Sequence, residues 1–143
     1  MRLGPTLDPH KFELHTGTDG ENNIWIAKSA KIANDVHLCG PLIVDHGTEI
    51  RHGAFILGKV IIGKNCVIGN STEIKNSVIL DNVQLPHYNY IGDYVELGCI
   101  CVVNPGTVIG KNTILYPLSC VRGIIGEDCI VSTKITITKK ERK

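Results

Sequence analysis

Histidine and cysteine are the side chains of this sequence best suited to metal binding or nucleophilic chemistry, and the chain has six of each. The cysteines form no Cys-x-x-Cys pair, and the closest two are Cys99 and Cys101. Structural zinc sites use closely spaced thiolate pairs, so this spacing argues against one. We interpret the cysteines as small buried hydrophobic residues of a protein in a reducing compartment.

The histidines are also spaced unfavourably for a metal. The zinc site of a γ-type carbonic anhydrase would need three histidines that converge across an interface, two of them close in the sequence. His46 and His52 lie six residues apart, and no histidine follows His87. We therefore expect no metal site, which leaves proton transfer as the chemistry open to a histidine here.

A six-residue repeat sets the positions of these side chains. Aliphatic residues recur at every sixth position from Ile26 to Ile74 and again from Ile79 to Val121, with one residue missing between the two runs. Four residues after most of these sites stands a small or β-branched residue: Ala30, Val36, Thr48, Ala54, Val60, Cys66, Thr72, Val78, Val83, Val95, Cys101, Thr107, Thr113 and Ser119. Two inward positions flanking one outward position are typical of a short strand, and Gly, Asn, Asp and Pro supply a turn in almost every repeat.

Short strands with a turn every six residues predict a three-sided coil of 18 residues, in which each strand pairs with its equivalent one coil later. The first predicted inner column contains Ile26, Val44, Ile62, Ile79, Leu97 and Leu115. The second contains Ile32, Ile50, Ile68, Leu85, Val103 and Val121, and the third Leu38, Ile56, Ile74, Ile91 and Ile109. We predict an all-β chain with a parallel β-helix of five to six coils over residues 24–131, an N-terminal arm or cap over 1–23, and a final strand and basic tail over 132–143.

Composition supports strands and excludes two classes of partner. The chain has 20 Ile and 12 Val against 4 Ala, and β-branched residues favour strands. Residues 134–143 carry five basic side chains and one Glu, so with a net charge of +1 overall the remaining 133 residues carry about −3. A nucleic-acid-binding body is therefore not expected. The sequence has no signal peptide and no apolar run long enough for a membrane span, so we expect no membrane partner and a cytoplasmic protein.

The hexad pattern resembles the hexapeptide-repeat superfamily of left-handed parallel β-helices over about Ile24 to Val131. The resemblance, and not the periodicity, implies the left hand. It also implies a homotrimer with sites between neighbouring chains, and it implies a CoA-dependent acyltransferase, because most members have that activity.

A second stretch resembles a narrower family. Gly69-Asn-Ser-Thr-Glu-Ile-Lys75 is followed by a shortened hexad and then by His87-Tyr-Asn-Tyr90-Ile-Gly-Asp93. The acetyltransferase domain of the bifunctional bacterial enzymes that acetylate and then uridylylate glucosamine-1-phosphate has the same lysine, the same shortened hexad and a histidine twelve residues after the lysine. Here Lys75 and His87 are also twelve apart.

This resemblance implies a role for each residue of the motif. His87 would be the general base that takes a proton from the sugar amine as the amine attacks the acetyl-CoA thioester. Lys75 would pair with the sugar phosphate, and Tyr90 would hydrogen-bond the sugar or the phosphate. Counting by coils places Asn34, His52, Asn70 and His87 in one outer column, which makes Asn70 and His52 candidates to orient His87.

The chain departs from this family at two places, and the departures keep a second function open. Leu57 stands about one coil before Lys75, where the family has a phosphate-binding arginine, and no Asn-rich insertion follows Asn104, the displaced substitute for a substrate-binding asparagine. We expect no uridylyltransferase half in the 25 leading residues. The first hypothesis is an N-acyltransferase that uses acetyl-CoA on an amino-sugar phosphate or a sugar nucleotide. The alternative is a non-catalytic sugar-nucleotide-binding or trimeric assembly module related to the sugar-phosphate nucleotidyltransferases.

Overall fold

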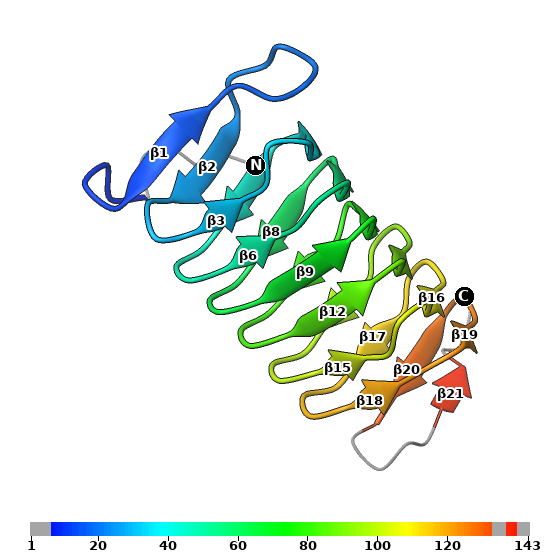
Figure 1. The fold of residues 1–143 in the computed structure, drawn as a ribbon. Helices are drawn as coiled ribbons and strands as arrows, with labels where there is room; N and C mark the ends of the chain where they lie inside the picture. Colours follow the sequence, from blue (N-terminus) through cyan, green and yellow to red (C-terminus); the bar gives the residue numbers. More distant parts are fainter. Residues whose placement is uncertain (1–6, 133–136, 140–143) are drawn as a thin grey trace.

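The computed structural model describes residues 7–132 and the backbone of residues 137–139. These ranges contain 21 short strands and no helix. The strands wind coil upon coil into a three-sided parallel β-helix of about six turns (Figure 1), which confirms the predicted all-β architecture. No helix in the described part of the chain could cross a membrane.

Each side of the β-helix is one sheet. Sheet A contains, in spatial order, β1 (Phe12–His15), β2 (Ile24–Ala27), β5 (Leu42–Val44), β8 (Val60–Ile62), β11 (Val78–Ile79), β14 (Glu96–Leu97), β17 (Ile114–Leu115), β20 (Cys129–Val131) and β21 (Ile137–Lys139). Sheet B contains β3 (Lys31–Ile32), β6 (Glu49–Ile50), β9 (Val67–Asn70), β12 (Gln84–His87), β15 (Val102–Val103) and β18 (Cys120–Val121). Sheet C contains β4 (His37–Cys39), β7 (Phe55–Leu57), β10 (Glu73–Lys75), β13 (Tyr90–Ile91), β16 (Val108–Ile109) and β19 (Ile124–Ile125).

The strand register places the predicted aliphatic columns inside the β-helix. Ile56 pairs with Ile74, and Ile74 pairs with Ile91, on sheet C. Two coils are shorter than 18 residues: Ile62 pairs with Ile79, and Ile109 pairs with Ile125. The strands keep their pairing through these short coils because the missing residues come out of the turns.

One inward position differs from the prediction. Val78 was expected to point inward, but it is half-buried and Ser77 occupies the buried position. The residue missing from the short hexad therefore lies before Ser77, in the turn after β10. The Ser77 hydroxyl donates to the carbonyl of Gly92 at 2.9 Å and accepts from the N–H of Val95 at 3.2 Å, so the buried hydroxyl is satisfied.

Antiparallel strands flank both ends of sheet A. β1 pairs with β2 at the N-terminal end, and β21 pairs with β20 at the C-terminal end. β1 covers only one of the three sides, which leaves the inward Ile32 and Leu38 of the first coil half-buried. Of the predicted final strand and basic tail over 132–143, residues 133–136 and 140–143 lie outside the described residues.

From Gly47 onward, each corner of the β-helix uses left-handed backbone at one position. The corner between sheets B and C has Gly53, Ser71, Tyr88, Gly106 and Gly123 at positive φ. A positive φ turns the chain sharply from one sheet to the next. This backbone conformation is strained for any residue with a Cβ. This B–C corner carries His87.

Candidate functional site

Lys75 and Tyr90 meet on sheet C. Their strands are neighbours, with Glu73 paired to Tyr90. The Lys75 Nζ lies 3.4 Å from the Tyr90 hydroxyl, 5.2 Å from the centre of its ring, and 4.0 Å from Glu73. The Tyr90 hydroxyl, and next the Glu73 carboxylate, raise the pKa of Lys75, so the ammonium stays charged at neutral pH. The pair thus presents a fixed cation beside an exposed hydroxyl.

His87 ends strand β12 at the B–C corner, with its side chain exposed. It pairs in register with Asn70 of β9, as the column count predicted. Its ring contacts the edge of Tyr88 at a centroid distance of 5.3 Å. Among the described residues its imidazole has no hydrogen-bond partner, so both ring nitrogens are available to a ligand.

Gly69 and Pro86 determine where His87 leaves the sheet. A Cβ at the buried Gly69 would lie 1.2 Å from the Pro86 carbonyl oxygen. The Cα register passes from the Leu85–Ile68 pair to the His87–Asn70 pair, with no Pro86 pair between them, because proline has no N–H to donate. Only glycine allows this close approach, which explains the glycine at the start of the Gly69–Lys75 motif.

The backbone on either side of His87 is anchored. The His87 carbonyl accepts the N–H of Gly106 at 3.0 Å, and the N–H of Tyr88 donates to the carbonyl of Asn70 at 2.9 Å. Asn89 is buried, and its side-chain oxygen accepts the N–H of Thr107 at 2.9 Å. The sequence analysis missed Asn89, although a polar residue at an inward repeat position was a usable signal.

Two other candidate residues, Asn104 and His52, make no side-chain hydrogen bond to His87 among the described residues. The side chain of Asn104 makes no hydrogen bond to His87, Lys75 or Tyr90 in the part of the chain that the structure describes. His52 lies in the turn after β6, the strand next to β9, and its Nδ1 is 3.2 Å from the Asp35 carboxylate. His52 is therefore held by Asp35, a residue that the sequence analysis did not select.

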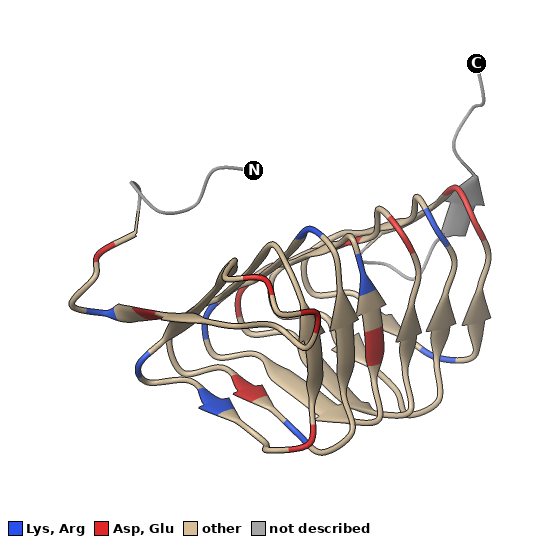
Figure 2. Ribbon diagram, turned by 90° about the horizontal axis from the view of Figure 1, so that it is seen from above, with Lys and Arg blue, Asp and Glu red and all other residues tan. Residues whose placement is uncertain are grey.

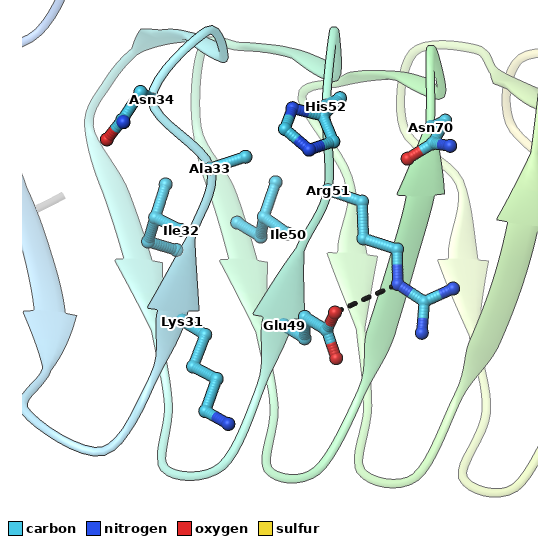
Figure 3. A pocket seen from close by; sticks show the side chains of 9 residues that line it. All are labelled: Lys31, Ile32, Ala33, Asn34, Glu49, Ile50, Arg51, His52 and Asn70. Atoms are coloured by element: carbon cyan, nitrogen blue, oxygen red, sulfur yellow. Dashed lines mark hydrogen bonds and ion pairs between the residues drawn. The ribbon is translucent and has the colours of Figure 1, made fainter.

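A hollow of about 530 Å³ lies on the outer face of sheet B (Figure 3). Its polar lining residues form two rows: the first is charged, and the second, at the B–C corner, has two amides and an imidazole. They are Lys31, Glu49 and Arg51 in the first row and Asn34, His52 and Asn70 in the second. Since Asn70 also pairs with His87, the hollow borders the predicted base.

Charge on the strands gathers in the first half of the molecule (Figure 2). Among residues 7–132, Glu96 is the only charged strand residue after β10. No group of His, Cys, Asp and Glu suited to a metal ion occurs in that range, and all six cysteines are unpaired. The polar chemistry of this molecule is therefore concentrated on sheets B and C, in the first four coils.

Stacked six-residue strands around an aliphatic core define the hexapeptide-repeat class of left-handed parallel β-helices. Within that class, the chain belongs to the GMPPB C-terminal domain family, whose model matches residues 38–141. The matched range contains most of the coils, including the whole Gly69–Asp93 segment.

Curated relatives resemble the same region. The bifunctional protein GlmU of Methanococcus maripaludis strain S2 is 33% identical over 118 residues, covering 69% of this chain and 28% of that protein. GlmU of Clostridium botulinum strain Loch Maree is 42% identical over 111 residues, covering 67% and 24%. The similarity falls in the C-terminal region of GlmU, so this chain spans about a quarter of the length of these relatives.

Solved structures share the fold at low sequence identity. The acetyltransferase domain of PglB from Neisseria gonorrhoeae superposes with a TM-score of 0.77 at 13% identity, covering 82% of this chain and 57% of that one. PerB from Caulobacter crescentus, in complex with CoA and GDP-perosamine, has a TM-score of 0.66 at 21% identity, covering 80% and 56%. The PglB domain has also been solved with acetyl coenzyme A. The chain is thus related at the level of fold to acetyltransferases.

Proposed function

We propose that this domain is an N-acyltransferase that uses acetyl-CoA to acetylate an amino-sugar phosphate or sugar nucleotide. The observation that carries the proposal is the arrangement at the B–C corner and sheet C: an exposed His87 without an internal partner, and Lys75 held against Tyr90. PerB, which shares the fold, has been solved with CoA and GDP-perosamine, which agrees with this class of substrate.

The reaction follows from these groups. The acceptor amine attacks the thioester carbonyl carbon, His87 accepts the proton that the nitrogen loses, and the C–S bond breaks. The proton then passes to the departing thiolate, which leaves as CoA thiol. Lys75 would bind the phosphate of the acceptor through its charged ammonium, and the Tyr90 hydroxyl would donate to the same ligand.

The second function, a non-catalytic sugar-nucleotide-binding or assembly module, is favoured by one position. Leu57 pairs in register with Lys75, so an apolar side chain stands beside the lysine where the acetyltransferase family has an arginine. Without that arginine, the acceptor phosphate would meet one cation where the acetyltransferase family has two, which would leave the amine less well positioned for attack.

Acetyl-CoA consumption with glucosamine-1-phosphate separates the two functions. We expect turnover in the wild type, a loss of about 10²- to 10⁴-fold in His87→Ala, and little change in His10→Ala, an exposed histidine of the N-terminal arm. Lys75→Ala should mainly raise KM. Absence of turnover with any amino-sugar phosphate or nucleotide, together with measurable binding of a sugar nucleotide, would establish the module instead.

We also propose that the chain works as a cytoplasmic homotrimer. The outward residues of sheet A form a largely apolar column, namely Trp25, Ile43, Ile61, Val78, Ile114 and Ile130, interrupted by Glu96. A flat apolar face of this kind favours self-association. Sedimentation velocity should give three times the mass of the chain; a monomer at micromolar concentration would contradict it.

A further inference from the structure

We propose that the hollow on sheet B is a second ligand site, which takes a monosaccharide carrying one phosphate group. Arg51 holds the phosphate, and Asn34, His52 and Asn70 bind the hydroxyl groups. This site lies on a different sheet from Lys75 and Tyr90, and it does not depend on acyl transfer.

The charged row provides the anion-binding groups. Arg51 donates through Nε to Glu49 at 3.0 Å, which fixes the plane of the guanidinium. In Figure 3 its other two nitrogens point away from Glu49, and neither has a partner among the described residues. A guanidinium held in this way can bind a phosphate with two parallel hydrogen bonds. Lys31 adds a second cation, so the row of Lys31, Glu49 and Arg51 has a net charge of +1 at neutral pH.

The His52–Asp35 pair provides a hydroxyl acceptor. A carboxylate can only accept, so the 3.2 Å contact requires that Nδ1 of His52 carries the hydrogen. In the neutral form of the ring, Nε2 then has a free lone pair that can accept a hydroxyl hydrogen. Asp35 also accepts the N–H of Gly53 at 3.2 Å, and this backbone bond is the main reason that the pKa of Asp35 lies below its ordinary value. The carboxylate therefore stays ionised and keeps the imidazole in one tautomer.

The remaining lining residues narrow the ligand to a sugar. Asn34 and Asn70 stand on either side of His52, and each amide offers both a donor and an acceptor (Figure 3). His52 is the one aromatic ring in the lining, which contains no Phe, Tyr or Trp. Its volume of about 530 Å³ is that of a small-molecule site. Mixed donors and acceptors beside a cation match a phosphorylated polyol.

The test is a titration of the full chain with glucose 1-phosphate, followed through the histidine ring signals in NMR spectra. The His52 signal is assigned as the one that is lost in His52→Gln. We expect the His52 signal to shift saturably, and Arg51→Ala to weaken the binding about ten- to a hundredfold. Arg122→Ala is the matched control, because Arg122 is exposed at the equivalent position of the last coil and should leave the affinity unchanged. Arg51→Lys keeps the charge but loses the two parallel N–H donors of the guanidinium, so it should bind glucose 1-phosphate with intermediate affinity.

Three results would overturn the proposal. The first is a His52 signal that does not move, and the second is a shift with the same affinity in Arg51→Ala as in the wild type. The third is loss of the shift in Lys75→Ala, which would assign the binding to the site on sheet C. Inorganic phosphate that binds as tightly as glucose 1-phosphate would contradict the role of Asn34, His52 and Asn70. Because the readout needs no acetyl-CoA, failure of the acyltransferase proposal leaves this test intact.

Discussion

The first three coils of the β-helix, residues 24–79, and the coils that follow, residues 80–131, share one backbone plan and differ in what they place at its corners. In the first half every left-handed corner position is Gly, Asn or Ser: Gly47, Gly53, Gly58, Asn65, Ser71 and Asn76. In the second half the equivalent positions include Tyr88, Tyr94, Ile100 and Leu118. Left-handed backbone costs a bulky residue about 1–2 kcal/mol, so the second half is strained where the first half is relaxed.

The surfaces differ in the same direction. Outside the N-terminal arm, all exposed large hydrophobic side chains among the described residues lie beyond residue 79: Leu80, Tyr88, Tyr90, Tyr94, Ile100, Val102, Tyr116, Leu118 and Ile124. The charged strand residues lie mainly in the first half (Figure 2). Because the first half forms the same coils without bulky corners, the fold does not require them. The first half is thus richer in charged strand residues, and the second half is richer in exposed apolar side chains.

The largest expected effect contrasts a packed glycine of the first half with an open glycine of the second. Gly69→Ala should lower the free energy of unfolding by about 3 kcal/mol or more, because the new Cβ would overlap the Pro86 carbonyl. Gly106→Ala meets no atom within 4 Å and carries only the strain of its φ of +72°, about 1–2 kcal/mol. Urea unfolding measures both. Equal effects would show that close packing between coils is not what selects Gly69.

A buried threonine from each half gives the next contrast. The Thr48 hydroxyl donates to the Gly63 carbonyl at 2.6 Å and accepts the Cys66 N–H at 3.1 Å, so Thr48→Val should cost about 1–3 kcal/mol. The buried Thr107 hydroxyl has no partner among the described residues, so Thr107→Val should be neutral or slightly stabilising. Thermal unfolding of the two variants measures the two changes in stability. A larger loss of stability in Thr107→Val than in Thr48→Val would contradict this prediction.

Strain in the second half can be removed by substitution. Ile100→Asn should raise the free energy of unfolding by about 1 kcal/mol, because Asn tolerates the φ of +63° and already stands at Asn65 and Asn82 in the same corner. Ile124→Asn is the control: it removes an exposed Ile from strand β19, where φ is not positive, and should change stability by less than about 0.5 kcal/mol. If Ile100→Asn and Ile124→Asn change the free energy of unfolding by the same amount, the effect would come from removing an exposed isoleucine and not from relieving backbone strain.

The smallest expected effect is a pH dependence in the first half. The folded-state pKa of Asp35 is depressed, chiefly by the Gly53 N–H, so the carboxylate stabilises the folded chain above its unfolded pKa. That contribution disappears as the pH falls through the lower folded value. The stability difference between wild type and Asp35→Asn should therefore be present at pH 6 and vanish in strong acid. A difference that persists unchanged in acid would mean that ionisation of Asp35 is not its source.

The candidate site could be predicted only in part, for a local reason. Lys75 and Tyr90 are one coil apart on one sheet, and counting along the repeat is enough to bring them together. Asp35 is one full coil of 18 residues before Gly53 and therefore not in the column of His52, so counting by coils does not pair Asp35 with His52. Ser77, rather than Val78, points inward because the missing residue comes out of the turn before it, a choice that hydrophobic spacing leaves open.

The sequence by itself determined the coils, their sides and their inner columns, because side chains that alternate in a strand and recur every six residues can bury an aliphatic core in only one register. Tertiary structure alone decided which polar side chains meet across neighbouring coils. The approach of Pro86 to Gly69, the hold of Asp35 on His52 and the hollow beside Arg51 depend on turn geometry and side-chain direction, on which the spacing of the repeat places no constraint.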